Sequence, residues 1–526
     1  MRFLVGGLAV AGVLAAVACG GKDGATTAPA SNLTLADLPV KLPSYIAGTY
    51  EQTIDHGTDG SAPLPVASAA TDDAGAAPPV AGADPDAGVA PTTFTQRYWY
   101  NPAYSTGPDS PVLLYICGES ACSSAYGSSL ADSARTLGAS IIVLEHRYYG
   151  ASIPFGTPNL EQMKYLTIHN ALEDLAAFEK FAVDKHALNG KWIAVGGSYP
   201  GMLAAFYRLK HPELVAGAWA SSAPIGVVSS FSGYDALASR TLGPECSMLV
   251  RQAEDEVDAK FADPAQRAAL IERVYGPLDE AVAAKITPLS IKGMVMGGGK
   301  SAAQYGSTHY FCGSLKQHES DPLEGYFQYT DPTLADDPVT PDDGADAGDA
   351  GVIAIDDAGA LPLSPGGDVR VPGFPAFVDP DLAPAAAPRQ IPAWTYQTCR
   401  EVGFFQVHNS DRTQSVAPVE YSDAYFEASC AKQFHMLPNI AGTRSTYFDP
   451  IASGQATNIL FVNGSADPWS SLSLTDPSAV PAGISVLVVR DGSHCEDLTN
   501  LYPGELAGVF EAHLKFNQLA KEWLAQ

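Results

Sequence analysis

The sequence has 526 residues, 46% of them hydrophobic, so it can bury a large core in one domain carrying an insertion or in two domains. Acidic residues number 58 against 30 basic ones, which gives a net charge of −28. A surface of that sign repels phosphate backbones and anionic lipid head groups, so we expect no nucleic-acid partner.

The N-terminus has the pattern of a secretory signal. A short basic start precedes an apolar run from Leu4 to Val17, which is too short to span a membrane. We predict a signal peptide over residues 1–18, with Cys19 lipidated as in a bacterial lipobox. The alternative is ordinary cleavage nearby with loss of Cys19. Either way the protein is expected to be exported, as a cell-envelope lipoprotein or a secreted protein, and to meet a membrane only through that anchor.

Two segments stand apart by composition. Residues 59–92, which follow an N-terminal segment over 19–58, and residues 333–368 are rich in Ala, Asp, Gly and Pro and contain no aromatic residue. Such segments cannot bury enough apolar surface to offset the entropy cost of ordering, so we predict two disordered insertions. Their Asp-Gly repeats lack the spacing of a calcium loop, and we expect no metal.

Short apolar runs and helical periodicity alternate through much of the remaining chain. Six runs, each ended by polar residues or glycine, are typical of buried parallel strands: Val112–Ile116, Ile141–Leu144, Trp192–Val195, Ala216–Ala220, Ile459–Val462 and Val486–Val489. This alternation predicts a doubly wound, mostly parallel α/β sheet, built from residues 93–225 and 441–526. Residues 226–440 lose the strand rhythm, and we expect an inserted helical cap domain there.

The strongest motif follows the run at Trp192. The strand enters the sequence Gly-Gly-Ser-Tyr-Pro-Gly, centred on Ser198, and a helical pattern follows. A strand, a serine between small residues and a helix form the nucleophile elbow of an α/β hydrolase, in which a strained turn exposes the hydroxyl at the carboxyl edge of the sheet. Pro200 replaces the second glycine of the usual pattern, which the first turn of a helix tolerates.

A serine nucleophile needs a base and a residue that orients it, in the chain order Ser, Asp or Glu, His. Asp467 lies in the loop after the run at Ile459, and His494 lies in the loop after the next run. Each residue alone has an ordinary structural explanation, but their order and context favour catalysis. The predicted triad is therefore Ser198, Asp467 and His494, acting through an acyl-enzyme with no cofactor.

The tetrahedral intermediate also needs donors for its oxyanion. We expect one donor to be the backbone N–H of Tyr199, directly after the nucleophile, and the other to come from the loop at Gly118 and Glu119. The Glu119 carboxylate has two readings that the sequence leaves open: it holds a substrate amine, or it caps a nearby helix.

Several motifs resemble one known family. They are G-G-S-Y-P-G-M-L-A-A-F-Y-R-L-K-H-P at 196–212, A-S-S-A-P at 220–224, E-H-R-Y-Y-G at 145–150, W-T-Y-Q-T-C at 394–399, N-G-S-A-D-P-W at 463–469 and G-S-H-C-E-D-L at 492–498. From about Thr53 to the C-terminus, outside the two insertions, the chain resembles the serine peptidase family of lysosomal prolylcarboxypeptidase, quiescent-cell dipeptidyl peptidase and thymus-specific serine protease.

The resemblance implies an exopeptidase with the same triad, roofed by a helical domain, that cleaves short peptides after proline or alanine near a terminus. It also points to Met202 and Trp469 as walls of the proline pocket. Where the prolylcarboxypeptidase branch has a second histidine, this chain has Cys495. Which peptide terminus is recognised, and whether the protein forms a homodimer, stay open.

The chain has eight cysteines, one of them Cys19. Export favours disulfides, and the preferred bridges are Cys246 with Cys312 and Cys399 with Cys430. The pairing of Cys117, Cys122 and Cys495 stays open, and one of these three is left as a free thiol. Two other functions compete with the peptidase: an esterase or lipase on the same fold, and a non-catalytic surface-binding lipoprotein.

Overall fold

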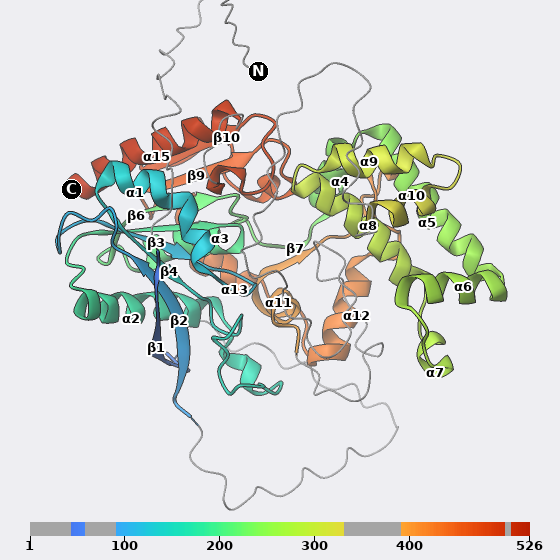
Figure 1. The fold of residues 1–526 in the computed structure, drawn as a ribbon, viewed down its shortest axis with the longest axis horizontal. Coiled ribbons are helices and arrows are strands. Elements are labelled where there is room, and N and C mark those ends of the chain that lie inside the picture. Colours follow the sequence, from blue (N-terminus) through green and yellow to red (C-terminus); the bar gives the residue numbers. More distant parts are fainter. Residues whose placement is uncertain (1–43, 58–90, 331–390, 500–505) are drawn as a thin grey trace, which may run out of the picture. The chain divides into compact units, whose positions relative to one another are not determined.

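A mixed sheet of eight strands carries the candidate site (Figure 1). The computed structural model describes residues 44–57, 91–330, 391–499 and 506–526. The strand order is β1-β2-β4-β3-β5-β6-β9-β10. The bounds are β1 Ile46–Thr53, β2 Thr93–Asn101, β3 Val112–Ile116, β4 Ser140–Leu144, β5 Trp192–Gly197, β6 Val215–Ser221, β9 Ile459–Gly464 and β10 Ile484–Val489.

The six predicted strands are confirmed as β3, β4, β5, β6, β9 and β10, which pair in parallel across the sheet. Two further strands, β1 and β2, form an antiparallel pair at one edge, and β2 joins β4 antiparallel. Neither strand was predicted, because β1 is largely exposed and burial alternates along β2, so neither has the long apolar run of a strand buried on both faces. The predicted α/β-hydrolase class, a mostly parallel sheet flanked by helices, is confirmed.

Helices cover both faces of this sheet. On one face α2 (Ile168–His186) packs beside α3 (Tyr199–Lys210), and on the other α1 (Ala131–Leu137) contacts α15 (Ala507–Ala525). Alternate strand residues divide between two hydrophobic clusters: Leu114 packs in the α2 and α3 cluster, whereas its neighbour Leu113 packs with α1 and α15. Burial on both faces explains why these strands read as continuous apolar runs.

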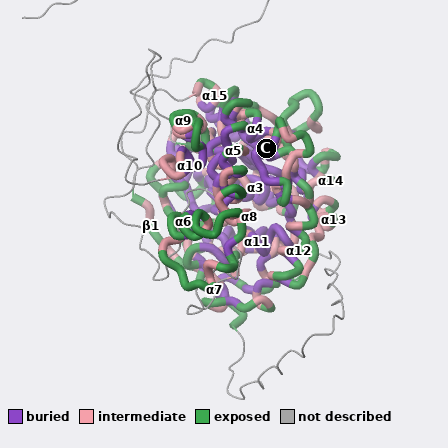
Figure 2. The backbone as a smooth tube through the Cα atoms, turned by 90° about the vertical axis from the view of Figure 1, so that its right-hand side faces the viewer, coloured by how far each residue is buried: buried purple, intermediate pink, exposed green. Residues whose placement is uncertain are grey.

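The position of the cap boundaries stays a prediction. The region assigned to the cap holds a run of helices. They are α4 Ser232–Leu242, α5 Pro244–Ala262, α6 Pro264–Tyr275, α7 Glu280–Ala283, α8 Pro288–Gln304, α9 Thr308–Gln317, α10 Pro322–Thr330, α11 Ala393–Gln397 and α12 Asp423–Phe434, followed by α13 Ala441–Thr443 and α14 Asp449–Ala452. Figure 2 shows that α6 and α7 are largely exposed.

A two-stranded parallel sheet, β7 (Val228–Ser230) with β8 (Gly403–Phe405), was not predicted in this region, because three-residue strands leave no periodic signal. Among the described helices, none is long and apolar enough to cross a membrane. All described residues fall within one compact unit.

Three disulfides are present in the described part of the chain. The predicted bridges Cys246–Cys312 and Cys399–Cys430 are confirmed, and both lie in the cap region. Cys117 pairs with Cys122, which leaves Cys495 as the free thiol among the described cysteines. The predictions for residues 1–43, including the signal peptide and Cys19, fall outside the described residues. The insertion predicted over 333–368 and all but the last two residues of the one predicted over 59–92 also fall outside them.

Candidate active site

The turn between β5 and α3 holds Ser198 in a strained conformation. Its backbone has φ 62° and ψ −131°, a left-handed φ that non-glycine residues rarely adopt. The neighbours must be small: a Cβ on Gly196 would lie 2.3 Å from the carbonyl oxygen of Pro200, and one on Gly201 would lie 2.7 Å from that of Ser221. The strand and helix thus nearly touch, which is the geometry of a nucleophile elbow.

Asp467 and His494 form a hydrogen-bonded pair at the same edge of the sheet. Asp467 follows β9 and His494 follows β10, and because these strands are parallel their carboxyl ends lie side by side. The Nδ1 of His494 lies 2.9 Å from the Oδ1 of Asp467, and both side chains are buried. The same Oδ1 accepts the backbone N–H of Trp469 at 2.9 Å. The carboxylate therefore fixes the ring orientation.

Burial alone would lower the pKa of His494, but the charge and hydrogen bond of Asp467, together with the neighbouring Cys495, raise that pKa well above 6.5. A histidine held in this way with Nδ1–H on a carboxylate presents Nε2 as a base. The pair thus has the orientation and the electrostatics that a general base needs.

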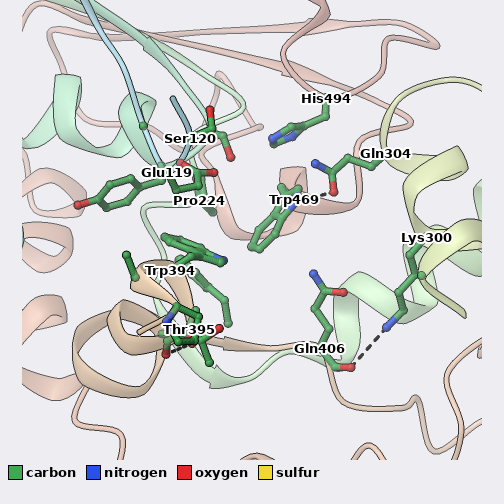
Figure 3. A pocket seen from close by; sticks show the side chains of 18 of the residues that line it. Glu119, Ser120, Pro224, Lys300, Gln304, Trp394, Thr395, Gln406, Trp469 and His494 are labelled. Atoms are coloured by element: carbon green, nitrogen blue, oxygen red, sulfur yellow. Dashed lines mark hydrogen bonds between the residues drawn. The ribbon is translucent and has the colours of Figure 1, made fainter. Parts of the chain in front are cut away.

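Ser198 and His494 open on one cavity of about 1330 Å³, whose centre Figure 3 shows. Ser198 is half-buried there, and its hydroxyl makes no hydrogen bond with the described residues. Bonds between nucleophile and base are often loose without substrate and tighten on binding. The structure therefore brings the three predicted triad residues to one site, with the Asp–His bond already made.

The loop after β3 forms another part of the cavity wall, where Gly118 and Glu119 line the cavity together with Tyr199. This loop rests directly on the elbow, since a Cβ on Gly118 would lie 2.5 Å from Cγ of Pro200. The Cys117–Cys122 bridge closes the loop. Burial raises the pKa of the Glu119 carboxyl, opposed by its own backbone N–H and by His494.

Of the two predicted pocket walls, the structure places one at the cavity. Trp469 lines it and packs among Phe231, Tyr234 and Phe404, with ring centroids 5.2–5.6 Å apart. Met202 is fully buried in the main hydrophobic cluster and is not part of the cavity wall. Helical spacing put Met202 one turn from Ser198, but its side chain points into the core. The predicted role of Met202 as a wall of the proline pocket is therefore corrected, and the residue packs in the core instead.

Sequence reasoning missed Gln304, the last residue of α8. Its carbonyl oxygen accepts the backbone N–H of His494 at 2.8 Å, and its side-chain oxygen accepts the indole N–H of Trp469 at 3.1 Å. No local motif marks this residue, because its partners lie far along the chain. It joins the cap to both the base and the aromatic wall.

An elbow serine and a buried Asp–His pair at the carboxyl edge of a parallel sheet define a hydrolase of the α/β type. The family model described as serine carboxypeptidase S28 matches residues 83–283 and 379–514, more than half of the chain, and the chain belongs to this family. The protein is accordingly a serine peptidase.

Individual relatives agree with this assignment. Thymus-specific serine protease of Mus musculus is 32% identical over 471 residues, covering 82% of this chain and 84% of that protein. Lysosomal Pro-X carboxypeptidase of Bos taurus is 26% identical over 438 residues, covering 77% and 79%. Among solved structures, proline iminopeptidase of Mycobacterium smegmatis is similar at a TM-score of 0.30 and 11% identity, over 82% of this chain and 96% of that one.

Proposed function

We propose that this protein is an exported serine exopeptidase that cleaves short peptides after proline, or alanine, near a terminus, through an acyl-enzyme. The observation that carries the proposal is the 2.9 Å bond between Asp467 and His494 in a buried pair that opens on the cavity of Ser198. A lone serine or histidine would have a structural explanation, but this constellation has the geometry of nucleophilic catalysis.

In the proposed mechanism the Ser198 hydroxyl attacks the scissile carbonyl carbon while Nε2 of His494 takes its proton. Asp467 holds the ring and stabilises the imidazolium. The backbone N–H of Tyr199 and one from Gly118 or Glu119 donate to the oxyanion. The imidazolium then gives its proton to the leaving amine, which leaves an acyl group on Ser198. Water, deprotonated by His494, attacks this ester and frees the enzyme.

Specificity for proline would come from the aromatic wall. A proline ring is compact and apolar and donates no hydrogen bond, so an apolar slot selects it better than a charged pocket does. Trp469, Phe404 and Trp394 supply such surface beside Ser198. The name of the bovine relative, a Pro-X carboxypeptidase, supports the same preference.

The preference for short peptides follows from the cap. Residues of α8 and α11 line the cavity together with the elbow and the oxyanion loop, so a substrate must enter beneath them. A long folded chain does not fit such a space. Export is consistent with the three disulfides, which form in oxidising compartments, and with a lysosomal relative.

Digestion of a synthetic peptide panel, with proline moved along the sequence and products read by mass spectrometry, tests the proposal. We expect cleavage directly after proline near one end. Hydrolysis of nitrophenyl esters with every peptide left intact would favour an esterase. Absence of reaction with a fluorophosphonate probe would favour a non-catalytic binding protein.

A further inference from the structure

Four buried side chains form one hydrogen-bonded chain behind the elbow. Nδ1 of His146 lies 2.7 Å from the carbonyl oxygen of Arg147, and Nε2 of His146 lies 3.2 Å from the hydroxyl of Tyr199. The carboxamide of Gln397 reaches the same hydroxyl at 2.9 Å, and its other end contacts the hydroxyl of Tyr149. The chain therefore joins the residue after the nucleophile to α11, which lies in the region assigned to the cap.

Each hydrogen bond in this chain has a definite direction. A carbonyl oxygen can only accept, so Nδ1 of His146 carries the hydrogen. Burial lowers the pKa of His146 to about 4, so the ring is neutral and its Nε2 can only accept. Burial raises the pKa of Tyr199 well above 10, so its hydroxyl keeps a proton and donates it to that nitrogen. The oxygen of Tyr199 must then accept from the NH2 group of Gln397, which leaves the amide oxygen of Gln397 to accept from Tyr149.

Gln397 lies behind the active-site cavity. It is 0% exposed and is not among the residues that line the cavity, whereas Tyr199 and Trp394 both line it. Trp394, labelled in Figure 3, precedes Gln397 by three residues on α11 and packs against the ring of Tyr199 with centroids 5.5 Å apart. The helix thus contacts Tyr199 twice, at its ring and at its hydroxyl.

Other contacts anchor α11 independently of the elbow. Cys399, two residues after Gln397, is bridged to Cys430 of α12. The Glu401 carboxylate accepts the backbone N–H of Ile168, at the start of α2, at 2.8 Å. Because these contacts do not involve the elbow, Gln397 can serve as a fixed point for the side chain of Tyr199.

The turn at the nucleophile needs such a fixed point. Ser198 has a φ of 62°, and a strained backbone of this kind persists only where its surroundings hold it. The N–H of Ser198 donates to the carbonyl oxygen of Ser221 at 2.9 Å, which holds the turn from one side. The N–H of Tyr199 belongs to the first turn of α3 and has no acceptor among the described residues. Its direction therefore depends on how the rest of Tyr199 is held.

We propose that Gln397 is a positioning residue, which holds the phenol of Tyr199 from the cap and thereby keeps the Tyr199 N–H directed at the oxyanion. This inference rests on the proposed peptidase mechanism and adds to it that the cap completes the oxyanion hole. Gln397 touches neither the substrate nor the reacting atoms. Its loss should therefore weaken binding of the transition state and leave binding of the substrate largely unchanged.

Two variants test the link between Gln397 and Tyr199. Gln397→Met keeps the approximate size of the side chain and removes both of its hydrogen bonds, and Tyr199→Phe removes only the hydroxyl. Each should lower kcat roughly 10- to 100-fold with KM changed less than about threefold, since removing an oxyanion donor outright costs about 10²- to 10³-fold. The double variant should lose little more than either single variant, because both changes break the same link. Additive losses would contradict the proposal.

A matched pair of inhibitors separates alignment of the oxyanion donor from a general loss of structure. With Ala-prolinal, the oxygen of Ser198 adds to the aldehyde carbon, its proton passes to His494, and the carbonyl oxygen becomes the oxyanion. Ala-prolinol, the corresponding alcohol, cannot form this adduct. Both compounds are used with a free and with an acetylated amino group, so that either polarity of the exopeptidase has a ligand.

In both variants the Ki of the aldehyde should rise about tenfold or more, while the Ki of the alcohol should change less than about twofold. A purely structural role would raise both values together or neither. Gln433→Met, the same change at a partly exposed position of α12, is the control and should leave kcat and both Ki values unchanged. If Gln397→Met does not fold, Tyr199→Phe decides the test alone.

Failure of this inference is separate from failure of the proposed function. Folded variants that keep the wild-type Ki for the aldehyde, or that lose affinity for aldehyde and alcohol equally, would overturn the role of Gln397 and leave the peptidase in place. A wild-type protein that cleaves no peptide, binds no aldehyde and does not label with fluorophosphonate would refute the function and this inference with it.

Discussion

The carboxylate of Asp497 accepts a hydrogen bond from the hydroxyl of Ser221 at 2.5 Å. It also accepts the indole N–H of Trp219 at 2.9 Å. Ser221 ends β6 and lies opposite Gly197, the residue before the nucleophile. The short helix that follows His494 is thereby tied to the strand beside the elbow. Asp497 is thus positioned to set the distance between base and nucleophile without contacting substrate.

Replacing Asp497 with alanine should lower kcat roughly 10- to 100-fold with a smaller effect on KM, because displacing the base by about 1 Å costs about 10²-fold. The change leaves the buried donors of Ser221 and Trp219 unpaired and should destabilise the protein by about 1–3 kcal/mol. Asp497→Asn, which keeps an acceptor, should recover part of kcat. Steady-state kinetics on the folded variants measure these effects. An Asp497→Ala variant with reduced stability but normal kcat would show that Asp497 has a purely structural role.

Replacing Asp467 with asparagine should shift the pH dependence of catalysis. Only the neutral His494 accepts a proton, so kcat/KM should rise with pH through the His494 pKa. Burial lowers that pKa, but Asp467, together with Cys495, raises it well above 6.5, so the acid limb of the wild-type profile should lie above pH 6.5. In Asp467→Asn the midpoint should move to lower pH and the plateau should fall about 10⁴-fold. A variant whose midpoint stays in place would argue against the pair.

Replacing Trp469 with alanine should reduce kcat/KM for peptides with proline at the cleavage position by roughly 1–3 kcal/mol and shift preference toward bulkier residues, since it opens the aromatic wall. Trp469→Phe keeps an aromatic ring but loses the bond to Gln304, so it separates the two contributions. The measurement is competition between peptides that differ only at that position. Faster wild-type cleavage after Lys or Phe than after Pro or Ala would refute the aromatic slot.

Glu179 on α2 should make stability depend on pH. Burial raises its pKa from 4.5 to about 8, opposed by the hydrogen bond from Tyr207. Between these values the folded protein holds a proton that the unfolded chain releases, so the free energy of unfolding falls as the pH rises through this window.

Glu179→Gln removes the titration, and it should be more stable than wild type at pH 8 by up to a few kcal/mol, with the difference shrinking toward pH 5. Urea denaturation at both pH values measures this. Glu161→Gln, at an exposed position, is the control and should change neither value. A stability difference that is the same at pH 5 and pH 8 would show that Glu179 does not titrate in this range.

The strands and the elbow that were predicted from the sequence share one property: each is marked by a pattern within a short stretch of neighbouring residues. Five of the six predicted strands lie inside the sheet, are buried on both faces and appear as continuous apolar runs, and the edge strand β10 keeps an apolar run although it is partly exposed. The elbow at Ser198 is defined within a few residues. β1 carries no such run, because most of its side chains are exposed at the sheet edge. β1 is recognisable as a strand only from its antiparallel pairing with β2.

The cap residues at the site could not be predicted in this way. Gln304 owes its role to contacts with His494 and Trp469, which lie more than a hundred residues away in the chain. Met202 shows the converse limit, since helical spacing gave its distance from Ser198 but not the direction of its side chain, which points into the core.

The central claim is that Ser198 is the nucleophile, and covalent labelling with a fluorophosphonate followed by peptide mass mapping tests it most directly. The account predicts one adduct, on Ser198, and a loss of peptidase activity on the order of 10⁴-fold or more in a folded Ser198→Ala variant, which should not label. An adduct on another residue, or a Ser198→Ala protein that keeps a tenth of wild-type activity, would contradict it.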